Sequence, residues 1–164
     1  MWDGWEKQHG AISSERASLA GFRRDFNKAS VLNWGSETHP CPTLGLSPDA
    51  SSKCEGMAFR FPISTRQQVK DAFQKREGGS FQVQKLLVEL LSGQHVEALV
   101  AVNDTSKNTF IGDLPLAERA RMTKRAGGSS GTCEVYARGI YDTLRAMGIT
   151  DNAVNAFWRE MSCE

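Results

Sequence analysis

The chain has 164 residues, 40% hydrophobic and 24% charged, which is typical of a globular protein long enough to bury one core. Its 20 basic and 19 acidic residues give a net charge of +1, so the charge indicates no nucleic acid or other polyanion as a partner. No apolar run approaches the roughly 20 residues of a membrane span, and no signal peptide pattern is visible. We therefore expect a cytoplasmic protein without membrane segments, whose oligomeric state is left open.

The cysteines and histidines are widely spaced and form no Cys-x-x-Cys or His-x-x-x-His pair. Reduced thiols are the expectation for a cytosolic protein. The spacing indicates no metal site, and no motif predicts a cofactor. The residues concerned are Cys41, Cys54, Cys133, Cys163, His9, His39 and His95.

The first third of the chain has weak periodicity. Trp2 and Trp5 open it, and a tryptophan pair of this kind is more often packing than a ligand platform. Residues 19–26 are compatible with a strand. Residues 33–53 are rich in proline, glycine, serine and asparagine and predict a long loop, which is either functional or a plain surface excursion. Residues 54–61 alternate and predict a strand.

Pro62 ends that strand, and a helix is predicted to follow it. Ser64 and Gln67 have the spacing of a capping box, and Val69 and Phe73 fall on one helical face. Glycines 78 and 79 are expected to end the helix, since glycine adopts the left-handed conformation without strain.

Glu77 stands at the end of this helix. A carboxylate there faces the negative end of the helix dipole, at a cost of about 0.3–1 kcal/mol. We expect this position to raise the pKa of Glu77, the direction that a general acid or base requires. The local residues on their own favour an exposed carboxylate paired with Arg76 or Lys75.

The second half begins with a predicted hairpin, in which strands at 81–91 and 96–102 are joined by a turn at Ser92 and Gly93. Helices are predicted over 113–126, over 132–147 and from residue 151. The glycine-rich residues 127–131 join two helices and lack the lysine of a phosphate loop. Hairpin-linked strands with helices around them predict an α+β fold with an antiparallel, barrel-like sheet.

Several segments, in this order and at this spacing, resemble the ChaC-like gamma-glutamylcyclotransferases, and together they cover nearly all of the chain. They are residues 21–26, 42–46, 54–59, Arg76-Glu77, residues 111–116, Tyr136, Leu144 and Gly148-Ile149.

The resemblance implies one domain over 1–164, a small antiparallel or mixed β-barrel with flanking helices. It implies a lyase that cleaves a gamma-glutamyl amide, glutathione in some members, to 5-oxoproline and the free amine. It assigns Glu77 as the general acid/base. Because the substrate carries its own nucleophile, the reaction is intramolecular and needs no metal or cofactor.

The chain departs from the family pattern at two places. The family's first strand and Tyr-Gly-Ser-Leu substrate loop would precede Met1, so the resemblance implies an N-terminally incomplete domain, with Trp2 just after the loop as a candidate substrate-binding residue. Glutathione-directed relatives have Arg-Gly-Thr where this chain has Trp34-Gly35-Ser36, preceded by Asn33.

Asn33, Trp34 and Gly35 are therefore candidate substrate-binding residues, and Trp34 favours an amine portion with less charge. Tyr136 is either a hydroxyl donor near the glutamyl end or a core residue of its helix. Two interpretations stay open: an enzyme, or a non-catalytic binding domain that keeps the fold.

Overall fold

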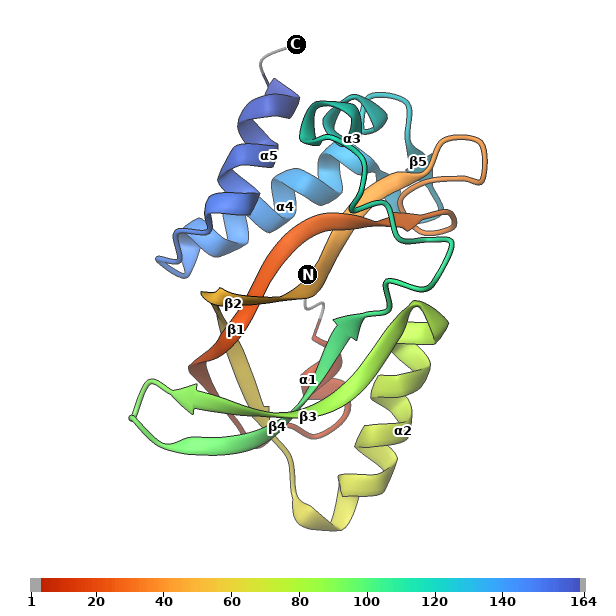
Figure 1. Ribbon diagram of the computed structural model, residues 1–164. Coiled ribbons are helices and arrows are strands. Elements are labelled where there is room, and N and C mark those ends of the chain that lie inside the picture. Colours follow the sequence, from red (N-terminus) through yellow and green to blue (C-terminus); the bar gives the residue numbers. More distant parts are fainter. Residues whose placement is uncertain (1–3, 163–164) are drawn as a thin grey trace. The chain divides into compact units, whose positions relative to one another are not determined.

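The structure, a computed structural model, describes residues 4–162. Figure 1 shows its helices and strands. The elements are α1 (Trp5–Gln8), β1 (Ser13–Ser30), β2 (Cys41–Arg60), the 3-10 turn η1 (Ile63–Thr65), α2 (Arg66–Glu77), the 3-10 turn η2 (Gly78–Ser80), β3 (Phe81–Leu90), β4 (His95–Asn103), α3 (Leu116–Met122), β5 (Gly127–Gly128), β6 (Gly131–Thr132), α4 (Cys133–Ala146) and α5 (Asn152–Ser162).

The fold is α+β, as the sequence predicts. Its main sheet has the strand order β2-β1-β3-β4, and β1 pairs with β3 in antiparallel register, with Ala17 opposite Leu90. Because β2 and β4 are the outer strands of this order, the described sheet is open and is not closed into the full barrel that the resemblance implied. The part of the chain described contains no helix long and apolar enough to cross a membrane.

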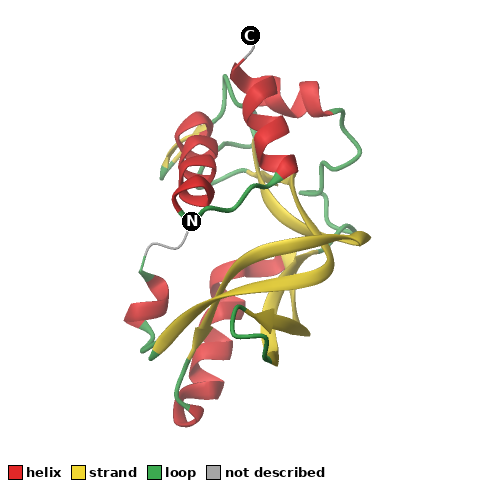
Figure 2. Cartoon of the chain, turned by 90° about the vertical axis from the view of Figure 1, so that its left-hand side faces the viewer, coloured by secondary structure: helices red, strands yellow, loops and turns green. Residues whose placement is uncertain are grey.

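The chain forms two compact units. The first contains residues 4–22 and 48–102, and the second contains residues 23–47 and 103–162. The long strands β1 and β2, drawn as bent ribbons in Figure 2, each contribute residues to both units. The expected single-domain organisation stays a prediction.

The predicted hairpin is confirmed in the first unit as β3 and β4. Leu90 N–H donates to Gln94 O at 2.8 Å, and Gly93 takes a φ of 83° that glycine adopts without strain. The predicted helix is present as α2, with Val69 and Phe73 buried on its inner face. Its capping box is wrong, because η1 precedes the helix and Thr65 is its N-cap without a side-chain hydrogen bond.

The core of the second unit lies under its three helices. Helix α5 packs against both α3 and α4. The Phe157 ring of α5 stacks on Phe26 of β1 with centroids 3.8 Å apart, and both side chains are fully buried. Ile140 and Leu144 place the apolar face of α4 in the same cluster.

Helix α4 begins and ends where its sequence predicts. The Thr132 side chain caps its first turn by accepting a hydrogen bond from Val135 N–H at 3.3 Å. Gly148 follows its last turn with a φ of 66°. The predicted helix over 113–126 is shorter in the structure, since α3 spans Leu116–Met122 and hydrogen-bonded turns continue to Ala126.

Two further expectations are wrong, one about the loop at residues 33–53 and one about the cysteines. Most of the predicted loop at 33–53 belongs to β2, which begins at Cys41. The thiols of Cys41 and Cys133 are not reduced but form a disulfide that joins β2 to α4, with Cα atoms 5.4 Å apart. Both cysteines are fully buried.

Candidate active site

Glu77 is the last residue of α2. Gly78 ends the helix with a φ of 70°, and its N–H donates to Gln74 O. The Glu77 Oε1 atom lies 3.5 Å from Arg76 Nε, and the Glu77 side chain is 22% exposed. The neighbour predicted from the local sequence is therefore the one observed, while the carboxylate stays in partial contact with solvent.

Arg76 is held by an aromatic residue from the start of the chain. Its guanidinium carbon lies 5.8 Å from the ring centroid of Trp5, within the range of a cation–π contact. The Trp5 ring stacks on His9 at 4.2 Å and contacts Phe73 of α2 at 5.9 Å. Helix α1 thus helps to fix the cation beside Glu77, a tertiary contact for which the sequence has no local signal.

Trp34 and Tyr136 form an aromatic pair in the second unit. Their ring centroids are 5.3 Å apart and their planes are tilted by 43°. The Tyr136 hydroxyl accepts a hydrogen bond from the backbone N–H of Leu44 at 3.1 Å. The backbone N–H of Trp34 donates to Ser30 Oγ at 3.3 Å. Tyr136 is therefore a buried core residue of α4 whose hydroxyl also serves as an acceptor for β2.

Asn33 and Gly35 shape the backbone on either side of Trp34. The Asn33 carbonyl accepts a hydrogen bond from Ser130 N–H at 2.7 Å. A Cβ at Gly35 would collide with the backbone of Ser30 and Cys41, so glycine is required by close approach rather than by its φ. These backbone contacts fix the position of the Trp34 loop.

The hairpin β5–β6 covers this loop. Ser129 N–H donates to Leu32 O at 3.0 Å, and a Cβ on Gly128 would collide with the backbone of Leu32 and Asn33. Gly131 lies against the Trp34 ring, where its Cβ would be 3.2 Å from Cζ3. The sequence signal for this contact is the run of glycines and serines at 127–131, where Gly128 and Gly131 allow the close approach.

The structure thus groups four of the predicted site residues. Asn33, Trp34, Gly35 and Tyr136 belong to one cluster in the second unit, whereas Glu77 belongs to the first unit. Trp2 lies outside the described residues. Within residues 4–162, no group of three or more His, Cys, Asp or Glu side chains is arranged to hold a metal ion.

Comparison with known proteins identifies the family. A family model described as ChaC-like protein matches residues 4–162, so the chain belongs to the ChaC-like family. Gamma-glutamylcyclotransferase 2-3 of Arabidopsis thaliana is 23% identical over 146 residues, which are 83% of this chain and 72% of the relative. Gamma-glutamylcyclotransferases are lyases.

Two solved structures share the fold. Both are crystal structures of a yeast gamma-glutamyl cyclotransferase specific to glutathione, one of them labelled with selenomethionine. The labelled one has a TM-score of 0.83 at 18% identity and covers 93% of this chain and 89% of its own. The other has a TM-score of 0.82 at 17% identity and covers 94% of this chain and 91% of its own.

Proposed function

We propose that this chain is a gamma-glutamylcyclotransferase that converts a gamma-glutamyl amide to 5-oxoproline and the free amine, with Glu77 as the general acid/base. The observation that supports this most directly is the Glu77 carboxylate, which ends α2, is 22% exposed and is oriented by Arg76. The predicted cytoplasmic location and the absence of a cofactor are part of the same proposal.

The chemistry requires one carboxylate. Glu77 takes a proton from the α-ammonium group of the gamma-glutamyl unit. The freed amine attacks the gamma-carbonyl carbon and closes a five-membered ring, and the bond from that carbon to the amide nitrogen breaks. Nucleophile and electrophile belong to one molecule, so positioning supplies much of the rate.

The same carboxyl group completes the reaction. Glu77 returns its proton to the departing amide nitrogen, and the second proton that the attacking nitrogen loses on ring closure is also transferred to the amine. The amine leaves as an ammonium group, so no proton is gained or lost overall. The ion pair with Arg76 restricts the rotamers of the carboxylate and keeps it in place for both transfers. Backbone N–H groups would stabilise the oxyanion that develops on the gamma-carbonyl.

The amine portion of the substrate is the less defined part. Trp34 stands where glutathione-directed relatives have arginine, so the charged partner for a substrate carboxylate is replaced by an aromatic surface. The Trp34 ring is half-buried against Tyr136 and Gly131, which makes this surface rigid. Glutathione is one candidate substrate, and gamma-glutamyl amides with an apolar amine portion are the class that Trp34 favours.

A panel of gamma-glutamyl amides tests the proposal. The purified chain is incubated with glutathione, gamma-glutamyl-alanine and gamma-glutamyl-phenylalanine, and release of 5-oxoproline is measured. We expect turnover of at least one compound, with kcat/KM higher for the apolar amides. Turnover of glutathione alone would contradict the role of Trp34, and no turnover of any compound would contradict the enzyme.

The alternative function, a non-catalytic binding domain, predicts a different result in the same panel. It requires saturable heat of binding with one of the gamma-glutamyl compounds and no 5-oxoproline. Calorimetry run beside the turnover assay therefore separates the two functions.

A further inference from the structure

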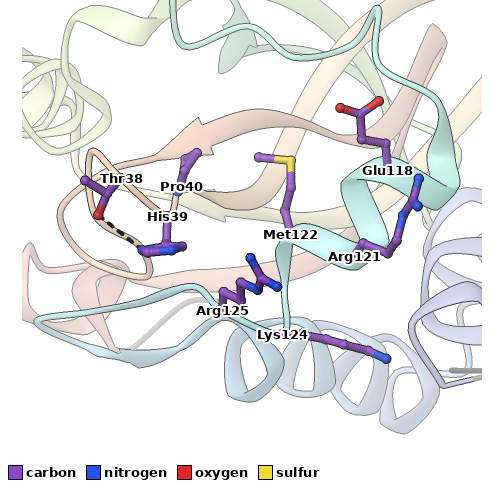
Figure 3. A pocket seen from close by; sticks show the side chains of 8 residues that line it. All are labelled: Thr38, His39, Pro40, Glu118, Arg121, Met122, Lys124 and Arg125. Atoms are coloured by element: carbon purple, nitrogen blue, oxygen red, sulfur yellow. Dashed lines mark hydrogen bonds between the residues drawn. The ribbon is translucent and has the colours of Figure 1, made fainter.

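A cavity of about 450 Å³ lies in the second unit (Figure 3), and neither Trp34 nor Tyr136 is among its lining residues. One wall is the loop at residues 38–40, and the other is α3 with the turn that follows it. The residues on the second wall are Glu118, Arg121, Met122, Lys124 and Arg125. A volume of this size is in the range of small-molecule sites.

The lining is cationic. It contains three basic side chains and one carboxylate, Glu118. Among residues 4–162, neither Glu118 nor Arg125 has a salt-bridge partner, so the positive charge of Arg125 is not neutralised within the described chain. Arg121 makes one weak hydrogen bond, from Nε to Ala117 O at 3.4 Å, which leaves its terminal nitrogens as donors.

The loop opposite the arginines is held by its own hydrogen bonds. Ser36 N–H donates to His39 O at 3.0 Å, and His39 N–H donates to Ser36 Oγ at 3.1 Å. The Thr38 hydroxyl lies 3.2 Å from His39 Nδ1. The imidazole is therefore oriented before any ligand arrives, with Nε2 left for an external partner.

The two arginines lie on either side of an apolar surface. In Figure 3 the Arg125 side chain extends between His39 and Met122, while Arg121 lies on the other side of Met122. Lys124 extends away from His39 in the same view, so the two guanidinium groups are the principal charges. Each guanidinium presents a planar fork of donors that matches a carboxylate or a phosphate.

We propose that this cavity binds a small elongated dianion, with one anionic group at Arg125 and His39, the other at Arg121, and an apolar middle against Met122. Dicarboxylates and phosphorylated carboxylic acids have this chemistry. The proposal does not depend on the gamma-glutamyl chemistry proposed for Glu77, because it is tested by binding rather than by turnover.

The test uses three probes: succinate as an elongated dianion, acetate as a single anionic group and inorganic phosphate as a compact dianion. Binding to the full chain is measured by calorimetry and by NMR signals of the arginine Nε–H groups. We expect succinate to bind at least about tenfold more tightly than acetate or phosphate, since it alone of the three carries two separated anionic groups.

Variants locate the binding. Arg125→Gln and Arg121→Gln should each weaken succinate binding about tenfold, to the level of acetate. Arg66→Gln on α2 is the matched control, because Arg66 is exposed, has no salt-bridge partner among the described residues and removes the same charge. It should leave succinate affinity unchanged.

Three outcomes would overturn the proposal. The first is the absence of saturable succinate binding, and the second is an equal loss of affinity in Arg66→Gln and Arg125→Gln, which would indicate general charge attraction. The third is phosphate binding as tight as succinate binding, which would contradict the two-ended ligand. Because all variants change exposed side chains, unfolding is not an expected cause of lost affinity.

Discussion

Asp25 and Arg119 form a buried ion pair that joins β1 to α3. Arg119 Nη1 lies 2.7 Å from Asp25 Oδ1 and also donates to Phe26 O at 2.9 Å. The two side chains are only 8% and 12% exposed, for Arg119 and Asp25 respectively. Removing Arg119 leaves Asp25 with the longer contact to the more exposed Arg23, whose Nη1 lies 3.4 Å from Asp25 Oδ2. The Asp25 charge is then poorly compensated in a site with little water, which costs more than the pair itself contributes.

Arg119→Met should therefore lower the free energy of unfolding by about 3 kcal/mol. Arg138→Met is the control, since the Arg138 pair with Glu134 is exposed and is expected to contribute about 0.5 kcal/mol or less. Urea unfolding followed by circular dichroism measures both. Equal effects of the two substitutions would show that the Asp25 carboxylate is not dependent on Arg119.

Glu89 is the residue whose titration the structure predicts. The hydrogen bond from Lys53, whose Nζ lies 3.1 Å from Glu89 Oε2, and then the charge of Lys53 hold the pKa of Glu89 below its ordinary value of 4.5. A carboxyl group with a lowered pKa stabilises the folded state above its unfolded pKa. That contribution is lost as the pH falls through the folded pKa.

An NMR titration should therefore find the pKa of Glu89 below 4.5, and Lys53→Met should raise it toward that value. Lys70→Met, on α2, should leave the pKa of Glu89 unchanged. A Glu89 pKa that is the same in the parent chain and in Lys53→Met would refute the interaction.

Strand β2 illustrates why part of the fold was not predictable from sequence. It contains Pro42, Gly45 and Pro48, which read as loop residues. The outer position of β2 in the sheet tolerates prolines, which lack a ladder donor. Gly45 is required because its Cβ would collide with the Asn27 side chain. Both reasons are tertiary and have no signal in a local window.

A helix end is predictable from sequence where a nearby side chain caps it, and less so where a preceding turn competes for that side chain. Helix α4 has a side-chain cap at Thr132, and its boundary was predicted correctly. Helix α2 was predicted with a capping box, but Gln67 instead donates to Asp71 Oδ1 at 2.8 Å, and the Thr65 hydroxyl donates to Pro62 O at 3.0 Å. A turn before the helix competes for the same side chains.

The β5–β6 hairpin yields a matched pair of glycine substitutions. A Cβ at Gly128 would collide with the backbone of Leu32 and Asn33, whereas a Cβ at Gly127 has nothing within 4 Å, and neither φ requires glycine. Gly128→Ala should cost about 1–3 kcal/mol, because backbone must move. Gly127→Ala should be close to neutral.

Thermal unfolding and tryptophan fluorescence measure this difference. We expect a lower Tm and a shifted emission maximum for Gly128→Ala alone. A Gly128→Ala protein as stable as Gly127→Ala would contradict the packing of the hairpin on the Trp34 loop.

The disulfide has consequences for the whole molecule. It closes a sequence separation of 92 residues between Cys41 and Cys133, so it restricts the unfolded chain over more than half its length. Disulfides typically contribute about 2–4 kcal/mol of stability. The expectation of reduced thiols is wrong because the fold brings together two cysteines that are far apart in the sequence.

Reduction of the native protein should therefore lower its Tm, and Cys41→Ser should abolish this response to reductant. Cys54→Ser is the control and should retain the response, because Cys54 takes no part in that disulfide. Peptide mapping without reduction should recover Cys41 linked to Cys133. A Tm that is insensitive to reductant would contradict the disulfide and indicate reduced thiols.

The position of Glu77 was predictable from local sequence, whereas the contacts of Arg76 and of Trp34 were not. The position of Glu77 at the helix end follows from Gly78 and Gly79, but its chemical role came from the resemblance to the family. The contact of Arg76 with Trp5 and that of Trp34 with Gly131 depend on segments distant in sequence. Local sequence therefore indicates the Glu77 carboxylate, but not the residues that pack against Arg76 and against Trp34.

The role of Glu77 is the central claim, and its isosteric amide is the most direct test. On the best gamma-glutamyl amide of the panel, Glu77→Gln should lower kcat for 5-oxoproline release by about 10²–10⁴-fold, since an amide cannot transfer the proton. Glu97→Gln, an exposed carboxylate on β4, is the matched control and should keep full activity. Turnover by Glu77→Gln at the rate of the parent chain would contradict the account.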